Sequence, residues 1–152
     1  MGKPFDREEQ TTGEHPYRVV LADDDFLFRP LLKRLIRGEP GLEVAADAGD
    51  GAELLALLSV LRSAPQMAIL DITMPNLGGI DTTSRIKAAY PGLKVLIVSI
   101  HREPEYVREA ISAGADGYVL KEDVDTELFP AIEKIRRGGA YFSAHLNAGD
   151  AL

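Results

Sequence analysis

Residues 67–75 read Met67-Ala68-Ile69-Leu70-Asp71-Ile72-Thr73-Met74-Pro75. The apolar run that leads into Asp71 is typical of a strand buried on both faces of a parallel sheet. Pro75 cannot extend this strand, so the chain leaves the sheet just after Asp71. Open α/β sheets bind their ligands at the carboxyl ends of their strands. Taken alone, the stretch leaves two interpretations of Asp71 open: a site residue or a solvated loop aspartate.

Four other apolar runs resemble the first one and alternate with segments of helical periodicity. The expected strands are residues 19–22, 43–46, 67–70, 95–98 and 117–120, and the expected helices are about 27–36, 51–61, 80–89, 104–113 and 127–137. Asp50 is expected to cap the second helix and Thr126 the fifth, which places Pro130 within the first four positions of the fifth helix. Five strands alternating with five helices predict right-handed crossovers and a parallel sheet with helices on both faces.

The composition limits the possible functions. A chain of 152 residues suggests one domain, here residues 17–140, between a flexible extension (1–16) and a tail (141–152). The 24 acidic residues exceed the 17 basic ones, which argues against unaided binding of a nucleic-acid backbone. Cysteine is absent, which excludes disulfides and Cys-ligated zinc. No apolar run reaches the roughly 18–20 residues of a membrane span, and the amino terminus does not resemble a signal peptide, so we expect a cytoplasmic protein.

Polar side chains follow four of the five expected strands. Asp23 and Asp24 follow the first strand, Asp71 the third, Ser99 the fourth and Lys121 the fifth. Because the carboxyl ends of parallel strands lie along one edge of the sheet, these five side chains should converge. Crowded carboxylates repel one another unless a cation offsets them, and Mg²⁺ prefers oxygen ligands. At such a site Asp71 could act as a nucleophile and form an acyl phosphate, with Mg²⁺, Lys121 and Ser99 holding the phosphoryl oxygens.

The segments 22–24, 70–75, 98–99 and 117–121 resemble the motifs of the response-regulator receiver domain of two-component signalling. The resemblance covers about residues 17–139. It implies a flavodoxin-like (βα)5 doubly wound sheet of five parallel strands in the order 2-1-3-4-5. It also implies a regulator that catalyses only its own phosphorylation and dephosphorylation, and whose phosphoryl group comes from a sensor histidine kinase.

The resemblance also implies a role for each site residue. Asp71 is the phosphoacceptor. Asp24, Asp71 and the Thr73 main-chain carbonyl would bind Mg²⁺ directly, and Asp23 would do so through water. Lys121 would pair with Asp71 and then with phosphate.

Ser99 and Tyr118 resemble the switch pair of the family. The Ser99 hydroxyl would move toward the phosphate, and the Tyr118 ring would turn inward behind it. We also predict that Thr73 and His101 line the path of the water that attacks the acyl phosphate, and therefore set its lifetime. No comparable role is expected for His15 or His145, and the three histidines are too scattered to predict a metal cluster.

Residues 28–29, 113–118 and 135–142 resemble the LuxR-type subfamily, whose members carry a carboxy-terminal helix-turn-helix that binds DNA. No such unit fits after Tyr141. We therefore expect a receiver fragment of a transcription factor, which would contact DNA only through a domain absent from this chain. A stand-alone receiver that acts through protein contacts is the alternative. A homodimer is expected, for which the first and fifth helices are one option.

Four positions depart from the subfamily or superfamily pattern without removing a site residue. They are Asp25, Phe26, Gly78 and Glu122. The effect of Asp25 and Gly78 on metal affinity is left open.

Three other classes of protein are less consistent with the sequence. A phosphatase of the haloacid dehalogenase type needs a second aspartate two residues past the nucleophile, where this chain has Thr73. A nucleotide- or flavin-binding protein needs a glycine-rich turn after the first strand, where this chain has three aspartates. A receiver that signals without phosphorylation would not need the site residues that are present.

Overall fold

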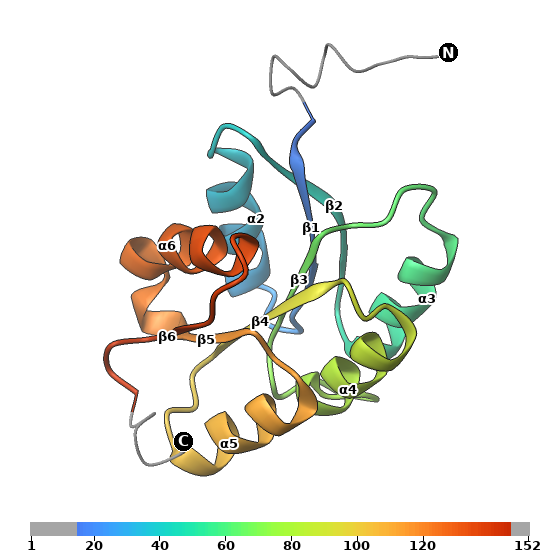
Figure 1. The fold of residues 1–152 in the computed structure, drawn as a ribbon. Helices are drawn as coiled ribbons and strands as arrows, with labels where there is room; N and C mark the ends of the chain where they lie inside the picture. The colour runs from blue at the N-terminus through green and yellow to red at the C-terminus, as the bar shows by residue number, and fades with distance from the viewer. Residues whose placement is uncertain (1–14, 147–152) are drawn as a thin grey trace.

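The fold is a six-stranded parallel sheet in the order β2-β1-β3-β4-β5-β6, flanked by helices on both faces (Figure 1). It is seen in a computed structural model, which describes residues 15–146. The strands are β1 (Tyr17–Ala22), β2 (Leu42–Ala48), β3 (Met67–Leu70), β4 (Lys94–Ser99), β5 (Gly117–Leu120) and β6 (Tyr141–Phe142). The helices are α2 (Phe28–Arg37), α3 (Gly51–Val60), α4 (Gly79–Ala89), α5 (Pro104–Ala113) and α6 (Val124–Arg136), with a short 3-10 turn η1 (Lys121–Asp123).

The core has two layers because the central strands are buried on both sides. On one face, Ala68 and Leu70 of β3 pack with residues of α3, α4 and α5. On the other face, Met67 and Ile69 pack with residues of α2 and α6. All four β3 residues are at most 1% exposed, which confirms the strand inferred from the apolar run. The predicted parallel sheet and its order of the first five strands are also confirmed.

Most of the predicted helix boundaries agree with the structure, but the start of the last helix does not. Asp50 caps α3 by accepting a hydrogen bond from the Glu53 amide at 2.8 Å. The predicted cap at Thr126 is wrong, because α6 begins at Val124 directly after η1. Pro130 therefore lies inside the helix. The Thr126 hydroxyl donates instead to the Asp123 carbonyl at 3.3 Å.

The sixth strand is an element that the sequence analysis does not predict. Tyr141 and Phe142 pair in parallel with Gly117 and Tyr118, so the sheet continues past residue 140. Gly117 permits this pairing, since a Cβ there would lie 2.8 Å from the Tyr141 carbonyl oxygen and 2.7 Å from the Ile135 side chain.

The expected extension, residues 1–16, falls almost entirely outside the described residues. Among the described residues, none of the helices combines the length and the apolar character needed to cross a membrane.

Candidate functional site

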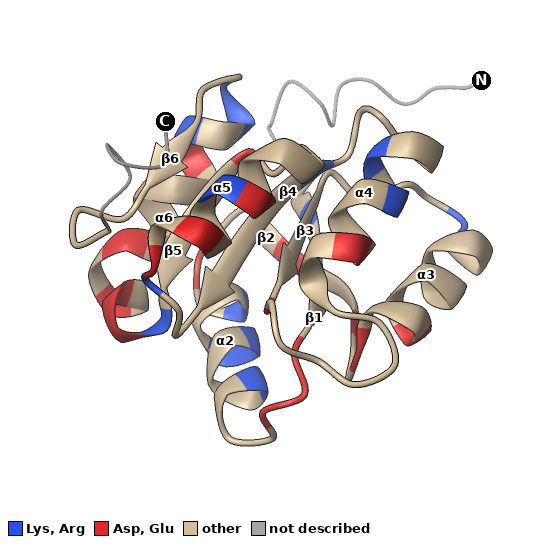
Figure 2. Ribbon diagram, turned by 90° about the horizontal axis from the view of Figure 1, so that it is seen from below, with Lys and Arg blue, Asp and Glu red and all other residues tan. Residues whose placement is uncertain are grey.

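A charged cluster of Asp23, Asp24, Asp71 and Lys121, which we call the pocket, lies at the carboxyl edge of the sheet, where β1, β3 and β5 end. Asp23 follows β1, Asp71 follows β3 and Lys121 follows β5. The Lys121 Nζ atom lies 3.0 Å from Asp23 Oδ2 and 3.3 Å from Asp71 Oδ2, so one ammonium bridges both carboxylates. Figure 2 shows the acidic segment after β1 as a red loop leading into α2. The structure thus brings together three of the residues that the sequence places at strand ends.

Asp71 is held firmly by its own backbone surroundings. Its side chain accepts a hydrogen bond from the Ile72 amide at 2.8 Å, and its amide donates to the Ala22 carbonyl at 3.0 Å. The start of α4 presses against it, because the Gly79 amide donates to the Ile72 carbonyl at 2.8 Å. A Cβ on Gly79 would come within 2.0 Å of the Asp71 carbonyl oxygen. Only glycine permits this approach, which places the amino end of α4 beside Asp71.

The surroundings of the cluster disfavour the charged forms of its two buried carboxylates. Asp71 is 7% exposed and Asp23 is 2% exposed. Burial raises the pKa of Asp71, the nearby Asp23 charge raises it further, and Lys121 opposes both. Burial also raises the pKa of Asp23, against hydrogen bonds from the Asp25 amide and Lys121. One ammonium therefore does not fully compensate two buried acids.

Lys121 is itself positioned by several groups. Its burial disfavours the charged form, but hydrogen bonding to Asp23 and the charges of Asp71 and Asp23 prevail and raise its pKa. Its ammonium also lies 4.5 Å from the centroid of the Phe28 ring and 3.9 Å from Asp25 Oδ2. The ammonium is consequently charged and fixed over the pocket at neutral pH.

Asp24 completes a set of oxygen donors. One carboxylate oxygen from each of Asp23, Asp24 and Asp71 lies within 4.8 Å of the others, and Asp24 is the exposed member. Hard oxygen ligands of this kind suit Mg²⁺, which retains several waters and needs only one or two protein carboxylates. Three carboxylates thus gather around the Lys121 ammonium, so negative charge is in excess in the cluster. The residues present therefore fit a divalent cation.

Asp25, whose effect the sequence analysis left open, has a clear structural role. Its Oδ1 atom accepts hydrogen bonds from the Leu27 and Phe28 amides at 3.0 and 3.1 Å, which caps the start of α2. These two bonds lower the pKa of Asp25. An aspartate just before a helical period is itself a capping signal, so the sequence could have supplied this role.

Ser99 and Tyr118 lie on the adjacent strands β4 and β5. Both side chains are completely buried. The Tyr118 hydroxyl donates to the His101 carbonyl at 2.7 Å, and the His101 amide donates to Ser99 Oγ at 3.1 Å. Burial raises the pKa of Tyr118 strongly, although a hydrogen bond between the Tyr118 and Ser99 hydroxyls acts in the opposite direction. The Tyr118 ring is thus in an inward position in this structure.

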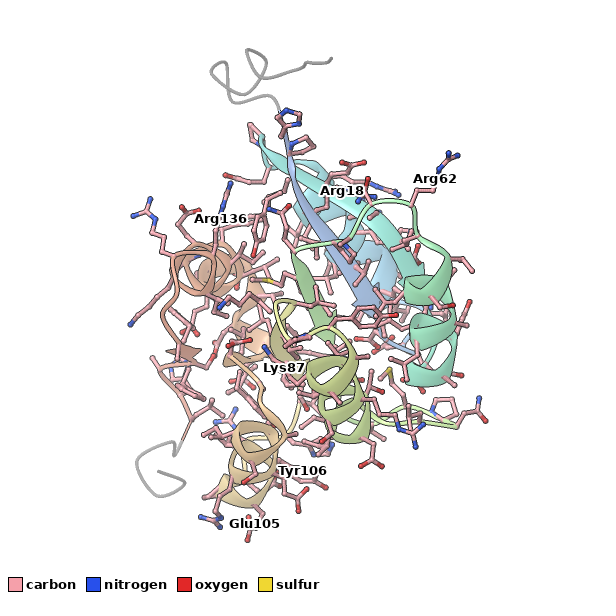
Figure 3. All side chains as sticks on the ribbon, turned by 45° about the vertical axis from the view of Figure 1, so that its right-hand side comes forward. Arg18, Arg62, Lys87, Glu105, Tyr106 and Arg136 are labelled. Carbon is pink, nitrogen blue, oxygen red and sulfur yellow. The ribbon has the colours of Figure 1, made fainter. Side chains whose placement is uncertain are left out.

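Thr73 and His101 also meet. The Thr73 Oγ1 atom lies 3.1 Å from His101 Nε2, which links the loop after β3 to the loop after β4. The His101 ring stacks on Tyr106, labelled on α5 in Figure 3, with ring centroids 4.2 Å apart. Two residues chosen from the sequence only by their spacing from Asp71 and Ser99 therefore form one bridge.

A second polar cluster was not predicted. His145, for which no role was expected, lies with its Nδ1 atom 3.1 Å from Asp123 Oδ2. Asp123 is only 8% exposed and also accepts a hydrogen bond from Ser143 at 3.3 Å. The sequence gives no signal for this cluster, because its members come from η1 and from the segment after α6.

The chain is similar in sequence to known regulatory proteins. Residues 19–133 match the family model described as the response regulator receiver domain. The chain is 36% identical over 132 residues to the transcriptional regulatory protein DegU of Brevibacillus brevis, covering 87% of this chain and 55% of that protein. It is 33% identical to the nitrate/nitrite response regulator protein NarP of Escherichia coli, covering 87% and 60%. The chain thus spans little more than half the length of these two relatives.

Solved structures agree with the sequence comparison. A two-component response regulator of the LuxR family from Aurantimonas sp. SI85-9A1 has a TM-score of 0.82 and 33% identity, over 90% of this chain and 95% of that one. The signal receiver domain of the putative response regulator NarL from Mycobacterium tuberculosis has a TM-score of 0.75 and 32% identity, over 82% and 98%. By its fold, its site and these matches, the chain belongs to the response-regulator receiver family, with LuxR-family regulators among its relatives.

Proposed function

We propose that this receiver accepts a phosphoryl group from a sensor histidine kinase on Asp71. The observation that supports this most is the bridging of buried Asp71 and Asp23 by the single Lys121 ammonium. A carboxylate oxygen of Asp71 attacks phosphorus, the bond from phosphorus to the kinase imidazole breaks, and an acyl phosphate forms. Lys121 remains within reach of the new phosphoryl oxygens and offsets their charge, since phosphoryl transfer depends mainly on positioning and charge stabilisation.

Mg²⁺ is the expected cofactor. Asp24, Asp71 and the Thr73 main-chain carbonyl would hold it, and Asp23 would contact it through water. When bound, the ion supplies positive charge to the oxygens of the transferring phosphoryl group. Asp23 stays bonded to Lys121 and to the Asp25 amide, which keeps the loop after β1 in place for the reaction.

The response to phosphorylation starts at Ser99 and Tyr118. A phosphoryl group on Asp71 draws the Ser99 hydroxyl toward it, and Tyr118 is favoured in its inward position behind Ser99. The hydrogen bond from Tyr118 to the His101 carbonyl ties this position to the loop before α5. This coupling would reshape the surface around α5 and β5.

We further propose that the bridge between Thr73 and His101 limits the approach of the water that hydrolyses the acyl phosphate. Its test is the dephosphorylation rate of His101→Ala, with His15→Ala as the matched control at an exposed position. A changed rate in His101→Ala alone supports the role, and an unchanged rate rules it out.

The output is proposed to be control of transcription, in line with two relatives, the transcriptional regulatory protein DegU and the nitrate/nitrite response regulator protein NarP. In that case DNA would be bound by a helix-turn-helix domain outside this chain, and receivers would pair as a homodimer. A stand-alone receiver that acts through protein contacts is the second candidate. Sequencing the native gene past the codon for Leu152 separates these two possibilities.

Mass spectrometry after incubation with acetyl phosphate and Mg²⁺ tests the phosphorylation itself. A single phosphoryl adduct is expected on the native chain and none on Asp71→Asn. Glu43→Gln is the matched control, because Glu43 pairs with Arg18 near the amino ends of β1 and β2, at the edge of the sheet opposite to the pocket, and should leave the adduct intact. An adduct that survives in Asp71→Asn would overturn the proposal.

A further inference from the structure

The segment after α6, residues 141–146, closes over the edge of β5 that holds Tyr118. Phe142 is the register partner of Tyr118, and neighbouring residues of a parallel pair project to the same face of the sheet. Phe142 and Leu146 both pack against the core cluster that contains Tyr118. Tyr118 is completely buried although its strand would be the edge of a five-stranded sheet. We call residues 141–146 the strap.

Ser143 fastens the strap to the backbone on both sides of the strand residue Val119. Its amide donates to the Tyr118 carbonyl at 2.9 Å, and its Oγ atom accepts from the Leu120 amide at 3.1 Å. Leu120 directly precedes Lys121. The strap is therefore hydrogen-bonded to the strand that carries the inward tyrosine and delivers the pocket lysine.

Two acidic residues hold the other side of the strap. The Ser143 hydroxyl is also 2.6 Å from Glu127 Oε1 and 3.3 Å from Asp123 Oδ2. His145 Nδ1 lies 3.1 Å from the same Asp123 oxygen. Asp123 ends η1, the turn that begins at Lys121. The three residues of η1 thus connect Lys121 to the carboxylate that holds the strap.

We propose that the strap docks on β5 only while Tyr118 lies inward, so that phosphorylation of Asp71 tightens it. This inference rests on the proposed function, because it takes the inward tyrosine as the state that phosphorylation favours. Its physical basis is that an outward tyrosine would take the register partner of Phe142 out of the apolar cluster against which Phe142 and Leu146 pack. The strap is also the segment that follows α6. Its docking therefore couples the phosphorylation of Asp71 to the part of the chain that follows residue 146.

Hydrogen exchange of the full 152-residue chain, read by mass spectrometry, tests the coupling. After acetyl phosphate and Mg²⁺, the amides of Leu120, Ser143 and Leu146 should exchange about fivefold or more slowly than in the untreated chain, as a coupling free energy of ordinary size requires. Equal rates in a sample that carries the Asp71 adduct would overturn the proposal.

A second measurement does not need phosphorylation. Ser143→Ala should loosen the strap and raise nitration of Tyr118 by tetranitromethane, located by peptide mass spectrometry and scaled to Tyr90 in the same sample. Ser59→Ala is the matched control, because the Ser59 hydroxyl bonds only within α3, to the Ala56 carbonyl. If Ser143→Ala does not fold, His145→Ala replaces it, since that side chain is 62% exposed. Unchanged Tyr118 nitration in the folded variant would overturn the strap, whether or not Asp71 is phosphorylated.

Discussion

Two clusters of acidic residues meet the two ends of η1, at Lys121 and at Asp123, and they differ in how their charges are compensated. In the pocket, Asp23 and Asp71 share one ammonium, and burial raises the pKa of both. At the strap, Asp123 is equally buried, but a hydroxyl and an imidazole approach the same carboxylate oxygen.

This difference in charge compensation distinguishes a candidate reaction site from a cluster that holds neighbouring segments in place. Carboxylates that are buried with too little positive charge cost stability in the free protein but gain most from a cation or a covalent change. A carboxylate supplied with hydrogen-bond donors has little to gain and serves to hold its neighbours in place. This contrast supports the proposed chemistry at Asp71 and a positioning role for Asp123.

The largest effect is expected from Gly79→Ala, which disturbs the backbone next to Asp71. A Cβ at this position meets the Asp71 carbonyl oxygen at 2.0 Å, so α4 or Asp71 must move, at a cost of about 3 kcal/mol in the free energy of unfolding. Phosphorylation by acetyl phosphate should fall with it. Gly92→Ala is the control, since a Cβ there meets no atom within 4 Å. Urea unfolding of both variants measures the change in the free energy of unfolding. Equal values for the two variants would contradict the close approach at Gly79.

The next prediction compares the two acidic clusters directly by neutralising one aspartate in each. Without metal at neutral pH, Asp71→Asn should stabilise the protein by about 1 kcal/mol, because it removes an under-compensated buried charge and leaves Lys121 paired with Asp23. Asp123→Asn should destabilise it by about 1 kcal/mol, because a neutral amide oxygen replaces the charged carboxylate oxygen that Ser143 and His145 approach, and it accepts weaker hydrogen bonds. Both are measured by urea unfolding in EDTA. If both variants changed the free energy of unfolding in the same direction, the two clusters would not differ in charge compensation.

A smaller effect concerns pH. The pKa of Asp71 is raised in the folded state, so the folded protein binds a proton more readily than the unfolded chain does. The stabilising contribution of this group is present below its ordinary pKa of about 4 and is lost as pH rises through the folded value. The advantage of Asp71→Asn should therefore grow from about pH 4 to about pH 7, as followed by unfolding at a series of pH values. A pH-independent difference would contradict the raised pKa.

The smallest effect is expected from His145→Ala at the strap. Hydrogen bonding to Asp123 raises the pKa of His145, so its contribution is present below the ordinary value of 6.5 and is lost as pH rises through the folded value. The variant should melt slightly earlier than the native chain in mildly acidic buffer and at the same temperature in mildly alkaline buffer. His15→Ala, at another exposed histidine, is the matched control.

The strand ends could be predicted from the sequence because they depend on short-range signals. The apolar runs before Asp71 and Lys121 specify buried strands, and a parallel sheet gathers their carboxyl ends at one edge. The start of α6 could not be predicted in this way. Pro130 suggested a helix start near Thr126, but η1 and the packing of Val124, Leu128 and Ile132 in the core extend the helix toward its amino end.

By itself, the amino-acid sequence determined the alternation of strands and helices, the edge at which the acids and Lys121 gather, and the family. Only the tertiary structure decided that Thr73 meets His101, that Tyr118 is inward, and that Ser143 and His145 fasten a sixth strand beside it. The reason is physical. Hydrophobic periodicity and turn residues act over a few positions, whereas each of these contacts joins segments at least 17 residues apart through the packing of side chains.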